Sequence, residues 1–130
     1  MGTQSCKSHH ELILWRKAVD LAVEAYRVTA AFPRSELYGL TSQLRRAAVS
    51  IPSNIAEGAA RRTTRDFISF LHVARGSLAE VETQLLIAQR VGAVQPEACC
   101  TLQGLIEEAG RLLHAVIKGL RDRVDAAQSC

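Results

Sequence analysis

Apolar residues recur at alternating steps of three and four along almost the whole chain, and this period limits the fold to packed helices. Four segments carry the pattern: residues 11–32, 36–61, 64–91 and 96–123. Strand-like alternation is absent from the sequence, and the connections are short. The sequence therefore predicts an all-α protein, an antiparallel up-down four-helix bundle over residues 11–124, with flexible tails at residues 1–10 and 125–130.

The first segment carries more apolar surface than one bundle needs. Its two rows are Leu12, Trp15, Val19, Ala22, Tyr26 and Thr29, and Leu14, Ala18, Leu21, Ala25, Val28 and Phe32. A monomeric bundle buries one stripe per helix, and a second stripe left in water would be an unusual patch. The excess favours a homo-oligomer, and a monomer with one broad stripe is the alternative.

Pro52 lies inside the second segment. Proline removes a backbone hydrogen bond and clashes with the carbonyl of Ala48, at a cost of about 3 kcal/mol in a regular helix. Ala47, Ile51 and Ile55 nevertheless keep a step of four across it. A loop would lose that phase, so we expect one helix, kinked at Pro52.

Local signals mark the other helix ends. Thr63 or Thr64 caps the third helix, and Thr63-x-x-Asp66 resembles a capping box with a shortened acid. Gly92 supplies a left-handed stop, and Pro96 opens the fourth helix from a first-turn position.

Positive charge is concentrated in one part of the chain. The net charge is +3, but residues 45–75 alone carry a net +4. The candidate phosphate ligands are Arg45, Arg61, Arg62 and Arg65, because clustered arginines attract nucleic-acid phosphates. Solvated arginines that only improve solubility are the alternative. Aromatic residues make up only 5%, and Trp15, Tyr26, Phe67 and Phe70 look like core. Binding would therefore depend on charge and be weakly sequence-specific.

A second set of polar residues lies away from the core stripes of the second and third helices, except that Arg75 and Glu82 fall near the edge of the third helix's stripe. The set is Arg46, Asn54, Glu57, Arg75, Ser77, Glu80, Glu82 and Gln84. Partly buried charges need partners, so we expect these residues to form a polar network between helices or subunits.

Catalytic and metal motifs are missing from the sequence. It has no Glu-x-x-His of di-iron bundles, no Gly-rich phosphate loop, no G-x-S-x-G and no H-E-x-x-H. The four cysteines form no C-x-x-C pair. We expect a non-enzymatic protein without cofactor, metal, membrane span or small-molecule substrate. The start lacks the apolar run of a secretory signal, which favours a cytoplasmic location.

Three stretches carry a family resemblance: "LILWRKAVDL", "FPRSELYGLTSQLRRAAVSIPSNIAEGAAR" and "FISFLHVARGSLAEVETQLLIAQRVG". Together they resemble the four-helix-bundle family of 23S rRNA intervening-sequence proteins, over about residues 12–92. The resemblance implies a small bacterial protein that assembles as a homopentameric ring. Its signature positions, Arg46, Asn54, Glu57, Gly76, Ser77, Glu80 and Gln84, would then serve packing and subunit joining.

A related branch also resembles this chain, namely the accessory variability determinants of diversity-generating retroelements. That likeness implies a basic pentamer that binds nucleic acid and a reverse transcriptase. The sequence leaves two functions open. The first is a ring that associates with nucleic acid, with RNA as the favoured ligand. The second is a structural adaptor that binds another protein without nucleic acid.

Overall fold

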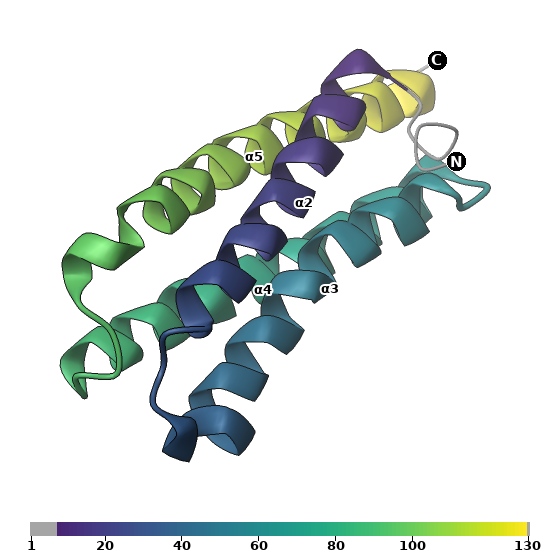
Figure 1. Ribbon diagram of the computed structural model, residues 1–130. Coiled ribbons are helices and arrows are strands. Elements are labelled where there is room, and N and C mark those ends of the chain that lie inside the picture. Colours follow the sequence, from purple (N-terminus) through teal and green to yellow (C-terminus); the bar gives the residue numbers. More distant parts are fainter. Residues whose placement is uncertain (1–7, 130) are drawn as a thin grey trace.

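The computed structural model describes residues 8–129, which form a bundle of four long helices (Figure 1). The helices are α2 (His9–Thr29), α3 (Ser42–Ala59), α4 (Thr64–Arg90) and α5 (Cys100–Ser129). Residues 8–129 contain no strand, so the all-helical four-helix prediction is confirmed. The close helix pairs are α2 with α3, α3 with α4, α4 with α5, and α5 with α2. The α2–α3 side of the bundle is therefore opposite its α4–α5 side.

The predicted apolar stripes of the later three helices form most of the core, and Leu40, Leu105 and Leu112 are only partly buried against it. The whole α4 stripe is buried: Phe67, Leu71, Ala74, Leu78, Val81, Leu85 and Ala88. Of the two rows on α2, the one that begins at Leu14 faces the core. In the other row Leu12, Trp15 and Val19 are only half-buried. Tyr26 is 47% exposed, so its assignment to the core was wrong.

The second helix begins later than predicted. Residues 36–41 were expected to be helical, but α3 starts only at Ser42. A 3₁₀ turn (Arg34–Glu36) and a five-residue π-type turn (Leu37–Thr41) precede it. Gly39 leaves helical geometry with φ −116° and ψ −110°, and an Oε1 atom of Glu36 accepts a 3.3 Å hydrogen bond from the amide of Leu40.

Within α3 the helix continues through Pro52 to Ala59. This confirms one helix rather than two, and the bend at Pro52 stays a prediction. Pro52 is itself buried, so its ring contributes to the packing.

The ends of α4 follow their local signals. The hydroxyl of Thr63 accepts a 3.1 Å hydrogen bond from the amide of Asp66, which settles the choice of cap. Gly92 has a φ of +79°, and the next amide, of Ala93, donates to the carbonyl of Ala88 at 2.9 Å. This is the left-handed stop that the sequence predicted. Pro96 opens a 3₁₀ turn (Pro96–Cys99) that leads directly into α5.

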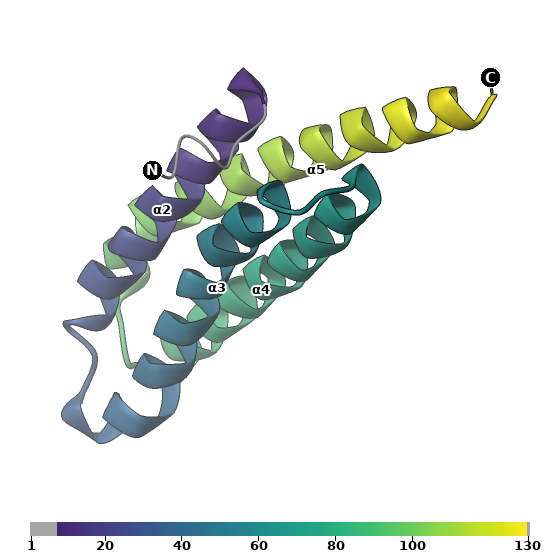
Figure 2. The ribbon, with the colours of Figure 1, turned by 90° about the vertical axis from the view of Figure 1, so that its right-hand side faces the viewer.

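Both outer helices differ from their predicted bounds. Ser8 caps α2, so His9 and His10 are helical rather than part of a tail, and the helix ends at Thr29 instead of residue 32. Helix α5 continues to Ser129, where fraying after residue 123 was expected. Figure 2 shows its C-terminal end standing clear of the other helices. The expected tails at residues 1–7 and 130 lie outside the described residues. Among the helices of residues 8–129, none is long and apolar enough to cross a membrane.

Candidate nucleic-acid interface

A chain of hydrogen bonds joins α3 to α4. The hydroxyls of Ser50 and Ser77 lie 2.8 Å apart. The amide of Asn54 donates to the carbonyl and hydroxyl oxygens of Ser50, at 2.8 and 2.9 Å. Ser77 is buried, so its hydroxyl needs this partner. Of the predicted polar network, the structure thus brings Asn54 and Ser77 together, with Ser50 between them.

The other members of that predicted network form no hydrogen bond with Asn54 or Ser77 within residues 8–129, and their contacts between subunits stay a prediction. Arg46, Glu80 and Glu82 are exposed. Glu57 forms an ion pair of 3.0 Å with Arg61 of its own helix end. The Oε1 atom of Gln84 is buried and has no hydrogen-bond partner among the described residues.

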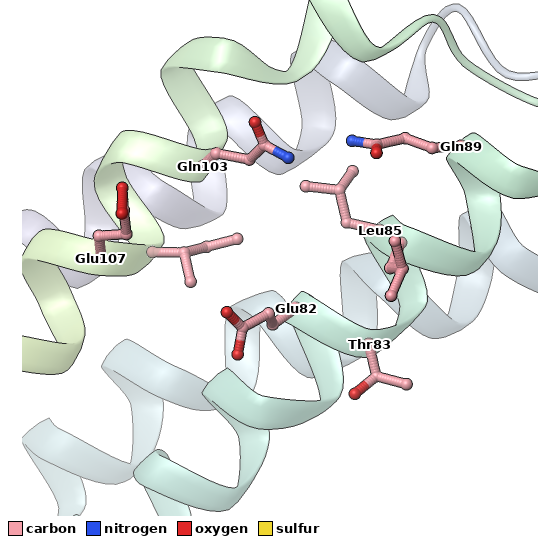
Figure 3. A pocket seen from close by; sticks show the side chains of 8 residues that line it. Glu82, Thr83, Leu85, Gln89, Gln103 and Glu107 are labelled. Atoms are coloured by element: carbon pink, nitrogen blue, oxygen red, sulfur yellow. The ribbon is translucent and has the colours of Figure 1, made fainter.

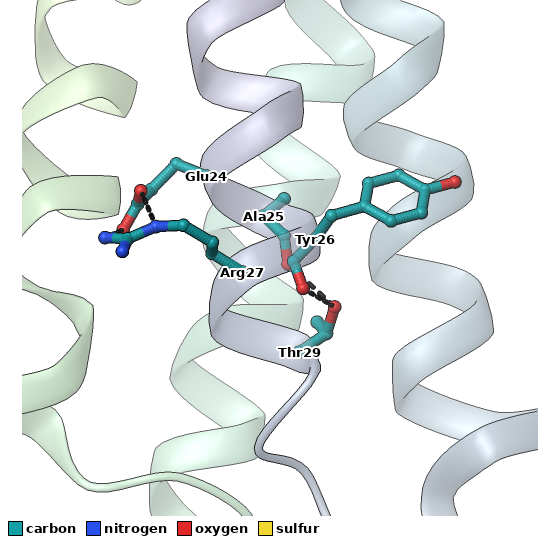
Figure 4. Close-up of polar contacts among 5 residues, drawn as sticks. All are labelled: Glu24, Ala25, Tyr26, Arg27 and Thr29. Atoms are coloured by element: carbon teal, nitrogen blue, oxygen red, sulfur yellow. Dashed lines mark hydrogen bonds and ion pairs between the residues drawn. The ribbon is translucent and has the colours of Figure 1, made fainter.

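Arg45, one of the candidate phosphate ligands, connects α3 to the end of α2. Its Nε donates to the hydroxyl of Thr29 at 2.8 Å, and its guanidinium lies 4.6 Å from the ring centre of Tyr26. The Thr29 hydroxyl in turn donates to the carbonyl of Ala25 at 2.7 Å (Figure 4). This guanidinium is therefore engaged in a contact between helices.

Figure 4 also shows the other side of the same turn of α2. Glu24 is buried and accepts hydrogen bonds of 2.8 and 3.1 Å from Arg27. These bonds and the negative charge of Glu24 raise the pKa of Arg27. A buried carboxylate and an exposed arginine are thereby neutralised within one helix turn.

The other three candidate arginines are exposed around the α3–α4 turn. Arg61 lies over the ring of Phe70, 4.7 Å from its centre, in addition to its pairing with Glu57. Arg62 lies in the turn and Arg65 in the first turn of α4. Their positions allow contact with a charged partner at this end of the bundle.

A cluster that the sequence did not reveal lies between α4 and α5. Two guanidinium groups approach one imidazole: Arg75 Nη2 lies 2.9 Å from His72 Nδ1, and Arg121 Nη2 lies 3.0 Å from His72 Nε2. A neutral imidazole has one donor and one acceptor nitrogen, so it can accept from only one of them. Neither arginine forms an ion pair with a carboxylate in the part of the chain that the structure describes.

The surroundings of this imidazole disfavour its charged form. Burial lowers the pKa of His72, and the positive charges of Arg75 and Arg121 lower it further. The sequence contained one usable signal, since residues 72 and 75 are one turn apart on a helix. Arg121 is 49 positions away from His72, and only the α4–α5 register brings the two together.

Comparison with known proteins identifies the family of the chain. The profile of the family described as 23S rRNA-intervening sequence protein matches residues 10–115. The chain belongs to this family. The fold of this chain is similar to that of a crystal structure from Bacteroides thetaiotaomicron. That structure is described as a protein with unknown function from the S23 ribosomal protein family. The two share 23% sequence identity and superpose with a TM-score of 0.77, over 84% of this chain and 98% of that one. No protein of curated function matches the chain.

No three metal-ligating side chains gather anywhere in residues 8–129. Cys99 is buried and the adjacent Cys100 is exposed, so these two thiols point to different surroundings.

Proposed function

We propose that this protein is a non-enzymatic homo-oligomeric bundle that binds nucleic acid through arginine contacts to phosphates. RNA is the nucleic acid that we favour. The observation that carries the proposal is the convergence of Arg75 and Arg121 on His72 without a carboxylate. The resemblance described above suggests five copies in a ring. The family name refers to 23S rRNA, which makes RNA the first ligand to test.

A phosphate would relieve the repulsion in this cluster. Two guanidinium charges repel each other, and one imidazole cannot accept hydrogen bonds from both. A phosphate carries several acceptor oxygens and negative charge, and arginine binds it with two parallel hydrogen bonds. An anion between Arg75 and Arg121 would therefore satisfy donors that His72 cannot.

The cluster extends into a basic stripe on α4. Arg65 precedes His72 by seven residues, so the two lie on the same face of the helix, about 10 Å apart. Arg62 lies nearby in the α3–α4 turn, where the acids Glu57 and Asp66 are also found. Successive phosphates of one strand could contact these positions in order, without any base being read.

Assembly of several copies would strengthen binding to phosphates. Several large apolar side chains are exposed on the single chain, among them Val23, Val73, Leu86, Ile87 and Val91. Burial of such surface supports association between copies. Each copy would add a net charge of +3 and another stripe, and phosphate contacts add because each one releases counterions.

A matched pair of charge-removing variants tests the phosphate contacts. Arg121→Gln removes one proposed contact, and Arg16→Gln removes the same charge from an exposed position on α2. Binding of a short single-stranded RNA is measured by fluorescence anisotropy across a series of salt concentrations. Arg121→Gln should make the slope of log affinity against log salt shallower by about 0.7, the value for one phosphate of a single strand, whereas Arg16→Gln should leave the slope unchanged.

If Arg121→Gln and Arg16→Gln change the slope of log affinity against log salt equally, the RNA does not bind at a defined interface. If the unmodified protein binds RNA at no salt concentration, the nucleic-acid part of the proposal is wrong. The adaptor function, in which the bundle binds another protein, would then be the hypothesis to test.

A further inference from the structure

The connection between α2 and α3 carries an exposed apolar projection. Tyr38 is 93% exposed and its neighbour Leu37 is 43% exposed. We call these two residues the α2–α3 knob. The π-type turn holds them away from the bundle, because Gly39 leaves the helix and Glu36 binds the amide of Leu40. A tyrosine ring in nearly full contact with water is a large apolar area available for burial.

A groove of matching character lies between α4 and α5 (Figure 3). Its volume is about 560 Å³. Apolar side chains line it, namely Leu85, Leu86 and Ile106, and the carboxylates of Glu82 and Glu107 stand on its two sides. We call this the α4–α5 groove, and its size accommodates an aromatic side chain together with a neighbour.

One of the residues that line the groove has a polar atom without a partner. The Nε2 atom of Gln89 is buried and makes no hydrogen bond within residues 8–129. Figure 3 shows Gln89 and Gln103 pointing toward one another from α4 and α5. A buried amide group without a partner is costly, so an occupant should bring a hydrogen-bonding atom. A tyrosine hydroxyl both donates and accepts, and can therefore satisfy an amide in either orientation.

The charges around the two surfaces are complementary. Arg46 is exposed and surrounds one surface pocket together with both residues of the knob. The exposed Arg34 lies three positions before the knob, and the acid of this segment, Glu36, is half-buried. Glu82 and Glu107 line the groove, and no basic side chain of the described residues lines it. Opposite charges at the rim steer association and fix its register.

We propose that the α2–α3 knob of one copy occupies the α4–α5 groove of the next copy, with the Tyr38 hydroxyl bonded to the Gln89 amide. The knob lies at the α2–α3 side of the bundle and the groove on the opposite side. Both lie at the same end of the molecule, where the α2–α3 and α4–α5 connections are found (Figure 1). Two different surfaces at the same end of the bundle, on opposite sides, form a head-to-tail contact, which closes into a ring when the rotation between copies permits.

This inference rests on the homo-oligomer of the proposed function and specifies its interface. A complementation experiment tests it. Tyr38→Asp removes the knob but leaves the groove, and Leu86→Asp puts a charge on the apolar lining of the groove but leaves the knob. Both side chains are exposed on the single chain, so neither change should unfold the bundle, which circular dichroism checks. Masses are measured by native mass spectrometry for each variant alone and for their equimolar mixture.

Each variant alone should be monomeric, and the mixture should give a one-to-one dimer that grows no further, because only one intact knob and one intact groove meet. Tyr38→Phe serves as the conservative control and should keep the assembly, with more monomer at low concentration. An assembly of unchanged size in Tyr38→Asp would overturn the inference. A monomeric unmodified protein would instead contradict the homo-oligomer itself, so the two failures are distinguishable.

Discussion

At the scale of single residues, the tightest approach at a glycine of the bundle is at Gly58 of α3. A Cβ atom built there would lie 2.6 Å from the Cβ of Phe70 and 2.9 Å from a ring carbon of Phe67. The Phe67 carbonyl oxygen would be 3.2 Å away. Because backbone and ring atoms cannot move aside cheaply, glycine sets the distance between α3 and α4 here.

Gly58→Ala should therefore lower the free energy of unfolding by about 2 kcal/mol, as expected for overpacking of a filled core. Gly76→Ala is the matched control, because nothing lies within 4 Å of its added Cβ atom. That change should raise the free energy of unfolding by up to about 1 kcal/mol through helix propensity. Urea denaturation measures both, and a decrease of the same size in the two variants would contradict the close approach.

His72 offers a second test at this scale. Its pKa is lowered in the folded chain, so below about pH 6.5 the unfolded chain binds more protons at this site. The contribution of His72 to stability should consequently fall as the pH drops from neutral through the lowered pKa. His72→Gln should weaken the pH dependence of the thermal midpoint over this range, measured by calorimetry. Identical pH profiles in the variant and the unmodified protein would contradict the environment described for this imidazole.

The same imidazole reports on ligand binding. A phosphate held by Arg75 and Arg121 would offset their positive charges, so the pKa of His72 should rise when a short RNA is added. NMR titration of the imidazole protons measures this directly. A pKa that is unaffected by an RNA that binds would place the phosphate contacts elsewhere.

At the scale of elements, the α3–α4 pair is joined by the Ser50–Ser77 hydrogen bond. A double-mutant cycle with Ser50→Ala and Ser77→Ala should give a coupling free energy of about 1 kcal/mol, since each single change leaves the other hydroxyl without this partner. The control cycle pairs Ser50→Ala with Ser69→Ala, because the Ser69 hydroxyl bonds to a carbonyl of its own helix. Additive effects in the first cycle would contradict a bond between the helices.

Helix bounds could be predicted where a local signal sets them. Helix α4 begins after its Thr63 cap and ends before Gly92, close to the predicted 64–91. The start of α3 could not be predicted, because Leu40 and Leu44 keep helical spacing across the end of the π-type turn. Neither the backbone of Gly39 nor the side-chain contact of Glu36 is visible in that spacing.

At the scale of the whole molecule, what the sequence could not supply was the register between elements. Two apolar rows on α2 were evident, but only the packed structure tells that the Leu14 row is inside and that Tyr26 is partly outside. Arg45, a predicted phosphate ligand, turned out to bind Thr29. The pairing of His72 with Arg121 likewise depends on how α5 lies along α4.

For the whole molecule, we propose an assembly of basic bundles that binds RNA through its phosphates. Light scattering coupled to size exclusion, at low and high salt and with and without a short RNA, tests it most directly. We predict a multiple of the chain mass at both salt concentrations, and an RNA that elutes with the protein only at low salt. A monomer that leaves the RNA free at low salt would contradict the claim.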